Sequence, residues 1–107
     1  MEAEGLYFLK ISGTVRMGKH HEIQQTVRFI FNQLPQPCVK RELAIDVDNS
    51  NRYHIFMLWQ SKAALMDFKS SNVYDVLTGA FQTLGTYQEE SGHEADVQLF
   101  DVIDIKV

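Results

Sequence analysis

At its centre the chain reads Arg52-Tyr53-His54-Ile55-Phe56-Met57-Leu58-Trp59. Side chains of a strand point alternately to its two faces, and in this stretch both sets are apolar. One set is Tyr53, Ile55, Met57 and Trp59, and the other contains Phe56 and Leu58. A strand that is apolar on both faces is typical of the interior of a sheet. Residues 52–59 are therefore predicted to form a central strand.

Periodic patterns on either side of this strand predict the other elements. Alternating residues predict strands over 6–16, 38–47 and 96–106, and helical spacing predicts helices over 20–34, 61–70 and 72–84. Pro35 blocks the first helix, Ser61 and Ser71 or Asn72 are suited to cap the next two, and Gly85 follows the last. The polar stretch from Thr86 to Ala95 is predicted to be a loop.

The order of these elements is typical of one fold class. Strand, helix, two strands, helices and strand give the ferredoxin-like βαββαβ arrangement, an α+β fold with a four-stranded antiparallel sheet. Its first and third strands are central, and its helices cover only one face of the sheet. With 107 residues, the chain is predicted to be a single domain over 1–107.

The uncovered face of that sheet leads to a prediction about assembly. We expect it to carry Tyr53, Ile55, Met57 and Trp59, which would form a large apolar patch in water. Burying each such side chain contributes roughly 1.5–3 kcal/mol before the costs of association. The sequence therefore predicts a homodimer through the open sheet face, with a cavity between the two sheets.

Composition excludes several classes of protein. The chain is 45% hydrophobic and 22% charged, with a formal net charge of −4, which argues against nucleic acid or an anionic membrane as partner. No apolar run approaches the ~18 residues of a membrane span, and the N-terminus lacks the pattern of a signal peptide, so a cytoplasmic protein is expected. The single cysteine, Cys38, excludes an intrachain disulfide and a thiolate-rich zinc site, and no metal is expected.

A few side chains are candidates for contacting a ligand. The indole N–H of Trp59 is a donor for an oxygen of an aromatic ligand, and Tyr53 and Tyr74 offer phenol hydroxyls. Arg41 lies among apolar residues of its strand and requires a carboxylate, a partner chain or an anionic ligand. Each of these residues also has a purely structural interpretation.

The histidines are weaker candidates. His54 alternates with Trp59 and is expected on the helix side of the sheet, as a structural residue. His20 and His21 are expected to face solvent. No Ser, His and Asp residues stand in a motif that supports nucleophilic catalysis.

Most of the chain resembles a known family. The carrying residues are Pro37-Cys38-Val39-Lys40-Arg41-Glu42-Leu43, the turn Asp48-Asn49-Ser50-Asn51, and Tyr53 to Leu65 with its Trp59-Gln60-Ser61-Lys62-Ala63-Ala64-Leu65 ending. They resemble the antibiotic-biosynthesis-monooxygenase-like group of dimeric α/β barrels. This group includes cofactor-free monooxygenases of polycyclic phenols, heme-degrading enzymes, isomerases and proteins of unknown activity.

Departures from the family pattern narrow what the resemblance implies. Met57 and Phe68 occupy positions where many members carry an acidic residue and a histidine, so acid–base chemistry from those positions is not expected. The iron-ligating histidine of the heme-degrading members falls on Thr78, so heme oxygenation is not expected either.

Two functions remain open from the sequence. The first is a cofactor-independent monooxygenase acting on a small phenol- or quinol-like compound, whose catalytic residue the sequence does not assign. Its predicted substrate-binding residues are Trp59, Tyr53, Arg41, Met57, Phe68 and Tyr74. The alternative is a non-catalytic dimeric protein of the same fold that binds a small apolar or aromatic ligand. An open pocket containing Arg41 or the tyrosines would favour the enzyme.

Overall fold

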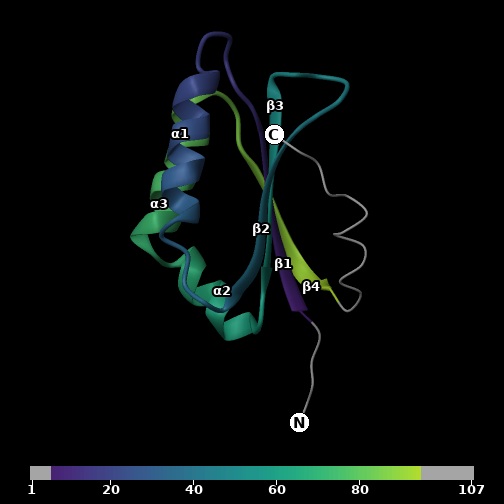
Figure 1. Ribbon diagram of the computed structural model, residues 1–107, viewed down its shortest axis with the longest axis vertical. Coiled ribbons are helices and arrows are strands. Elements are labelled where there is room, and N and C mark those ends of the chain that lie inside the picture. The colour runs from purple at the N-terminus through teal and green to yellow at the C-terminus, as the bar shows by residue number, and fades with distance from the viewer. Residues whose placement is uncertain (1–5, 95–107) are drawn as a thin grey trace.

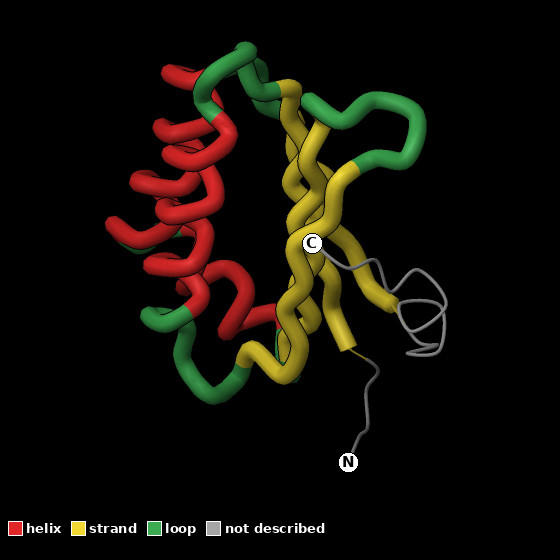
Figure 2. Tube along the Cα trace, turned by 45° about the horizontal axis from the view of Figure 1, so that its top comes forward, coloured by secondary structure: helices red, strands yellow, loops and turns green. Residues whose placement is uncertain are grey.

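A computed structural model describes residues 6–94, except for the side chains of residues 90, 93 and 94. The elements are β1 (Leu6–Thr14), α1 (His20–Phe31), β2 (Cys38–Ile45), β3 (Arg52–Trp59), α2 (Lys62–Lys69), α3 (Asn72–Leu84) and β4 (Gln88–Glu94). The sheet is antiparallel with the order β2-β3-β1-β4, which confirms the ferredoxin-like α+β prediction and its two central strands. All three helices lie on one side of the sheet (Figures 1 and 2). No helix in the described range is long and apolar enough to cross a membrane.

The helices cover the face that was expected to be open. Tyr53, Ile55, Met57 and Trp59 are at most 1% exposed and belong to one cluster with the apolar stripes of the helices. The helix residues of this cluster are Ile23, Val27, Ile30, Leu65, Phe68, Leu77 and Phe81. The prediction that these four strand residues face a partner was therefore wrong.

The reason lies in the pairing of the two central strands. Residues directly opposite each other in an antiparallel pair point to the same face. Leu9 pairs with Met57 and Ile11 with Ile55, so the single apolar face of β1 joins this set of β3 in one core. Alternation shows which residues share a face, but it does not show which face the helices cover. The homodimer remains a prediction, but the apolar patch from which it was inferred is buried beneath the helices.

The edge strand β4 corrects a second expectation. Residues 88–94, which were expected within a loop, pair with β1 from Leu6↔Glu94 to Ser12↔Gln88. An edge strand tolerates polar side chains on both faces, so its sequence resembles a loop. The strand predicted over 96–106 lies outside the described residues.

The connections between elements follow local rules. Ser61 and Ser71 cap α2 and α3, since their hydroxyls accept hydrogen bonds from the backbone N–H groups of Ala64 (3.1 Å) and Tyr74 (3.2 Å). Gly85 ends α3 where the chain passes very close to β1, and a Cβ there would lie 1.8 Å from the carbonyl oxygen of Thr14. This close approach, with φ at 177°, explains the glycine better than a left-handed helix cap does.

Candidate functional site

A pocket of about 370 Å³ opens on the helix side of the sheet, between the α1–β2 connection and helices α2 and α3. Its walls are mostly apolar, with three polar residues at Gln33, Asp67 and Ser71. The apolar lining consists of Pro35, Pro37, Ala64, Phe68 and Val73. A small concave site of this composition suits a flat apolar ligand that carries few polar groups.

Trp59 lies directly behind this pocket. It is the last residue of β3 and pairs with Cys38, and the next residue, Gln60, donates its backbone N–H to the carbonyl of Pro37 at 2.9 Å. Its ring stacks on Phe68 with centroids 5.0 Å apart. Trp59 therefore supports the wall of the pocket through Phe68 and does not itself line the pocket.

The indole N–H of Trp59 is the most informative atom of the site. Trp59 is fully buried, and its Nε1 is the one side-chain nitrogen or oxygen buried without a hydrogen-bond partner in the described part of the chain. A buried donor left unpaired costs about 1–3 kcal/mol. A ligand oxygen beside the ring would remove that cost, as the sequence-based role of Trp59 requires.

A cluster of polar side chains adjoins Phe68 through Tyr74. The ring of Tyr74 meets Phe68 edge to face at 5.5 Å. The hydroxyls of Tyr74 and Tyr87 lie 2.8 Å apart and both donate to the carboxylate of Glu89 on β4. Lys69 from α2 forms an ion pair with the same carboxylate at 2.5 Å. We call Lys69, Tyr74, Tyr87 and Glu89 the Glu89 cluster.

The charges of the Glu89 cluster are fixed by these contacts. Burial alone would raise the pKa of Glu89, but the hydrogen bonds from Lys69 and from both tyrosines outweigh it and hold the pKa below its ordinary value. Burial, together with the neighbouring carboxylate, raises the pKa of Tyr74 far above that of a free phenol. Glu89 is thus a stabilised anion and a weak base, and the Tyr74 hydroxyl is directed at Glu89 instead of the pocket.

Tyr53 is held by the protein itself. Its hydroxyl lies 2.7 Å from Nδ1 of His20 and accepts a hydrogen bond from the side-chain amide of Gln24 at 2.9 Å. The second nitrogen of His20 contacts Asn51 at 2.9 Å. His20, which was expected to face solvent, instead ties the start of α1 to β3.

Arg41 finds a partner that the sequence interpretation did not include. Its guanidinium donates to the backbone carbonyls of Phe31 (2.6 Å) at the end of α1 and Cys38 (3.1 Å) at the start of β2. Burial raises the pKa of the Cys38 thiol, although the charge of Arg41 opposes that shift. Arg41 thus holds the α1–β2 connection, which forms one side of the pocket.

The structure brings together only part of the predicted set. Phe68 lines the pocket and Trp59 lies behind it, whereas Arg41, Tyr53 and Tyr74 are absent from its lining and Met57 is buried in the core. The lining residues of the α1–β2 connection were missed, as were Lys69, Tyr87 and Glu89 of the Glu89 cluster. Prolines in a connection carry no chemical signal, and Glu89 was assigned to a loop.

The described residues show no metal site and no heme ligand at the family position. No group of three or more His, Cys, Asp or Glu side chains within residues 6–94 is arranged to hold a metal ion. The hydroxyl of Thr78 lies 3.4 Å from the backbone carbonyl of Asp75, to which it donates.

The fold is that of the antibiotic biosynthesis monooxygenase-like proteins, as solved structures show. SnoaB, a cofactor-independent oxygenase from Streptomyces nogalater, superposes with a TM-score of 0.72 at 16% identity, covering 87% of this chain and 96% of that one. A provisionally named antibiotic biosynthesis monooxygenase from Nitrosomonas europaea gives 0.73 at 10% identity, covering 91% and 96%.

A third similar structure is that of a protein of unknown function that is provisionally described as an oxidoreductase. A conserved protein of unknown function from Bacteroides thetaiotaomicron gives a TM-score of 0.76 at 13% identity and covers 86% of this chain and all of that one. Identities this low establish the shared fold and leave the activity open. No family model and no curated protein matches the sequence itself.

Proposed function

We propose that this protein is a cofactor-independent monooxygenase that acts on a small phenol- or quinol-like aromatic compound. The observation that carries the proposal is the buried, unpaired indole N–H of Trp59, whose ring stacks on Phe68 in the wall of an apolar pocket. The similarity of the fold to that of SnoaB, a cofactor-independent oxygenase, supports the same chemistry.

The chemistry needs few groups from the protein because the substrate supplies the electrons. An activated aromatic CH₂ group loses a proton to solvent, and the resulting anion passes an electron to O₂. The carbon radical and superoxide combine into a peroxide anion, which takes a proton from solvent to give the hydroperoxide. Loss of water from the hydroperoxide leaves a carbonyl, so that one oxygen atom enters the product and the other leaves as water. The negative charge of the anion rests largely on the phenolic oxygen, where a hydrogen bond stabilises it.

The residues of the site suit a reaction in which the substrate supplies the electrons and the protein supplies a binding pocket and one hydrogen-bond donor. Trp59 would donate its N–H to the phenolate oxygen, and the face of Phe68 would stack on the ligand ring. The mostly apolar walls make the surroundings of the anion less polar than water, which strengthens the electrostatic contribution of the one donor. The Glu89 cluster positions Phe68 through Tyr74 and does not supply the base.

A non-catalytic binding protein is the second candidate. The observation in its favour is that the pocket contains neither Arg41 nor a tyrosine, and its one titratable lining residue is Asp67. This alternative keeps the pocket and the indole donor but predicts that the bound compound is released unchanged.

Oxygen consumption with an anthrone- or quinol-like compound tests the proposal. We expect the wild-type protein to consume one O₂ per substrate converted, and Trp59→Phe to react about 100-fold more slowly, because removing one donor to an oxyanion has an effect of that order. Phenylalanine retains an aromatic ring against Phe68, so the variant removes the N–H with little loss of packing.

A matched variant distinguishes the effect of the indole donor of Trp59 from the effect of the aromatic wall formed by Phe68. Phe68→Leu keeps the indole N–H and should mainly raise KM. Binding of the compound by the wild type without oxygen uptake would establish the non-catalytic alternative. Equal uptake rates in wild type and Trp59→Phe would refute the role of the indole.

A further inference from the structure

A second pocket, of about 280 Å³, lies on the other side of helix α2 from the pocket described above. We call it the Lys62 pocket. Its lining consists of Tyr7 from β1, Lys62, Leu65 and Met66 from α2, and Ser91 and Gly92 from β4. The first pocket is lined from the same helix by Ala64, Asp67 and Phe68. Residues three and four apart share one face of a helix, so α2 separates the two pockets.

The Lys62 pocket lies on the helix side of the sheet. Tyr7 pairs with Trp59, and Ser91 pairs with Leu9, so Tyr7 and Ser91 point to the same face as these two buried residues. Gly92 contributes only its backbone. The pocket is therefore separate from the face opposite the helices, through which the homodimer is predicted.

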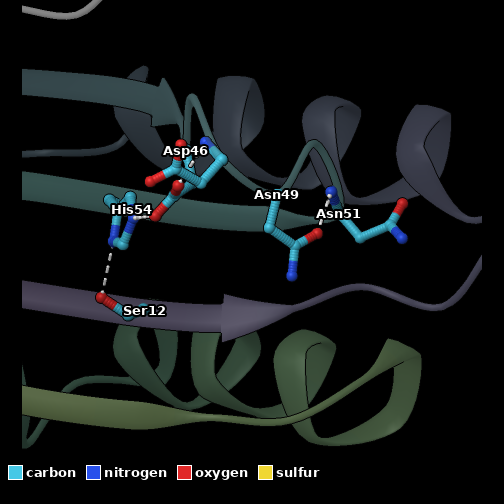
Figure 3. A network of polar contacts seen from close by, with 6 residues as sticks. Ser12, Asp46, Asn49, Asn51 and His54 are labelled. Atoms are coloured by element: carbon cyan, nitrogen blue, oxygen red, sulfur yellow. Dashed lines mark hydrogen bonds and ion pairs between the residues drawn. The ribbon is translucent and has the colours of Figure 1, made fainter.

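A network of polar side chains on that opposite face is satisfied within the protein. His54 contacts the hydroxyl of Ser12 at 2.9 Å and the carboxylate of Asp46 at 3.1 Å (Figure 3). The expectation that His54 points to the helix side was wrong, because the residues that alternate with Trp59 point away from the helices. This network needs no ligand to complete it.

The stripe of α2 that faces β4 carries two lysines in different surroundings. Lys62, Leu65, Met66 and Lys69 repeat at the i, i+3, i+4 and i+7 spacing of one helix face. Lys69 forms its ion pair with Glu89. Ser91 is the next residue of β4 on the same face as Glu89, and it lines the pocket together with Lys62. Lys62 thus meets a serine where Lys69 meets a carboxylate.

The ammonium group of Lys62 is left for a ligand. Within residues 6–94, no hydrogen bond or ion pair involves this group. The pocket beside it is lined by the apolar side chains of Leu65 and Met66 and by the ring of Tyr7. An ammonium group attracts an anion more strongly beside such a surface than in open water, because less water screens the pair. The exposed hydroxyl of Ser91 can donate a hydrogen bond to the same anion.

We propose that the Lys62 pocket binds a small aromatic carboxylate. The carboxylate contacts Lys62 and Ser91, and the ring of the ligand packs against Tyr7 and Met66. One lysine without an arginine suits a single negative charge better than the double charge of a phosphate. The volume is at the small end for ligand pockets, which favours a compound with one ring. The site does not depend on the proposed oxygenase activity.

Titration of the ¹⁵N-labelled full-length protein with benzoate at pH 7 tests this site. The backbone N–H resonances of Ser91 and Gly92 should shift and reach saturation. Benzyl alcohol has the same ring without the charge and should bind about tenfold more weakly, because it lacks the charge-assisted hydrogen bond to Lys62. Added salt should weaken the binding of benzoate and leave that of benzyl alcohol nearly unchanged.

Variants of exposed lysines assign the charge. Lys62→Gln should weaken benzoate about tenfold and leave benzyl alcohol unchanged, whereas Lys62→Arg should retain the affinity for benzoate because it retains the charge. Lys19→Gln is the matched control, because it removes an equally exposed lysine charge at the start of α1 and changes the net charge by the same amount. Its affinity for benzoate should equal that of the wild type. Circular dichroism checks that each variant is folded.

Three results would overturn the proposal. The first is a titration in which benzoate leaves the Ser91 and Gly92 resonances in place, including one in which it shifts only Gln33 in the wall of the first pocket. The second is equal affinity for benzoate and benzyl alcohol. The third is a folded Lys62→Gln protein that binds benzoate as tightly as the wild type.

Discussion

The Tyr53 hydroxyl was predicted to contact a ligand, but in the structure it forms hydrogen bonds with His20 and Gln24 of α1. Asn51 accepts from Nε2 of His20, so Nδ1 of His20 accepts the proton of Tyr53, whose oxygen in turn accepts from Gln24. Every hydrogen-bonding position of the phenol is thereby used within the protein. A strand-end tyrosine carries the same sequence signal whether its hydroxyl faces a ligand or a neighbouring helix.

Tyr53→Phe is predicted to lower the free energy of unfolding by about 1 kcal/mol, because it removes hydrogen bonds to His20 and Gln24 but keeps the buried ring. Urea denaturation measures this change. The affinity for a phenolic ligand should stay at the wild-type value. A variant with unchanged stability and weakened ligand binding would contradict this assignment.

Of the predicted site residues, Phe68 lines the pocket and Trp59 stacks on it. Both were singled out as candidates, and they stack behind and in the wall of one pocket. Arg41 was also recognised as a charge that needs a partner, but backbone carbonyls satisfy it. Sequence identifies a group that requires a partner more readily than it identifies the partner, since backbone acceptors are present everywhere.

At the scale of elements, the strength of the periodic pattern of apolar residues decided which helices and strands could be predicted from the sequence. Strand β3 was predicted with its observed bounds, and Ser61 was predicted as a cap, because apolar alternation and capping residues are local signals. Ser71, which caps α3, was one of two residues predicted for that position. Strand β4 was missed because Gln88, Glu89 and Glu90 have little strand propensity. Pairing with β1 stabilises this strand, and that pairing is not a local property.

The Glu89 cluster gives β4 a contact with the helix layer that depends on charge. Lys69 of α2, Tyr74 of α3 and Glu89 of β4 join three elements through one carboxylate. Glu89→Gln is expected to lower the free energy of unfolding at pH 7 by about 1–2 kcal/mol, allowing for partial solvent screening of the ion pair.

The sign of the pH dependence follows from the lowered pKa of Glu89. The folded-state pKa is below the ordinary value of 4.5, so the contribution of Glu89 is present above that value and is lost as the pH falls through the folded-state pKa. Denaturation curves of wild type and Glu89→Gln should therefore converge in acid and separate near neutrality. A difference that persists unchanged at low pH would show that the carboxylate charge is not involved.

At the scale of the whole molecule, the sequence predicted the topology but not which face the helices cover. Element order and the two-sided apolar strand led to the ferredoxin-like sheet, which the solved structures share. The predicted face was wrong because alternation within β3 alone does not show which of its two residue sets joins the apolar face of β1. The homodimer, its partner face and the cytoplasmic location remain predictions.

The two faces of the sheet carry different groups. The helix side holds the pocket, the aromatic wall and the indole donor, whereas the opposite side holds the network of Ser12, His54 and Asp46.

The unpaired indole N–H is the centre of the functional account, and the single tryptophan of the chain makes it directly observable. A ¹⁵N-labelled sample gives one indole N–H resonance, which Trp59→Phe removes and so assigns. Titration with a non-oxidisable anthraquinone-type ligand is predicted to shift the proton of this resonance downfield as the new hydrogen bond forms. An indole resonance that stays in place while the ligand is shown to be bound would contradict the account.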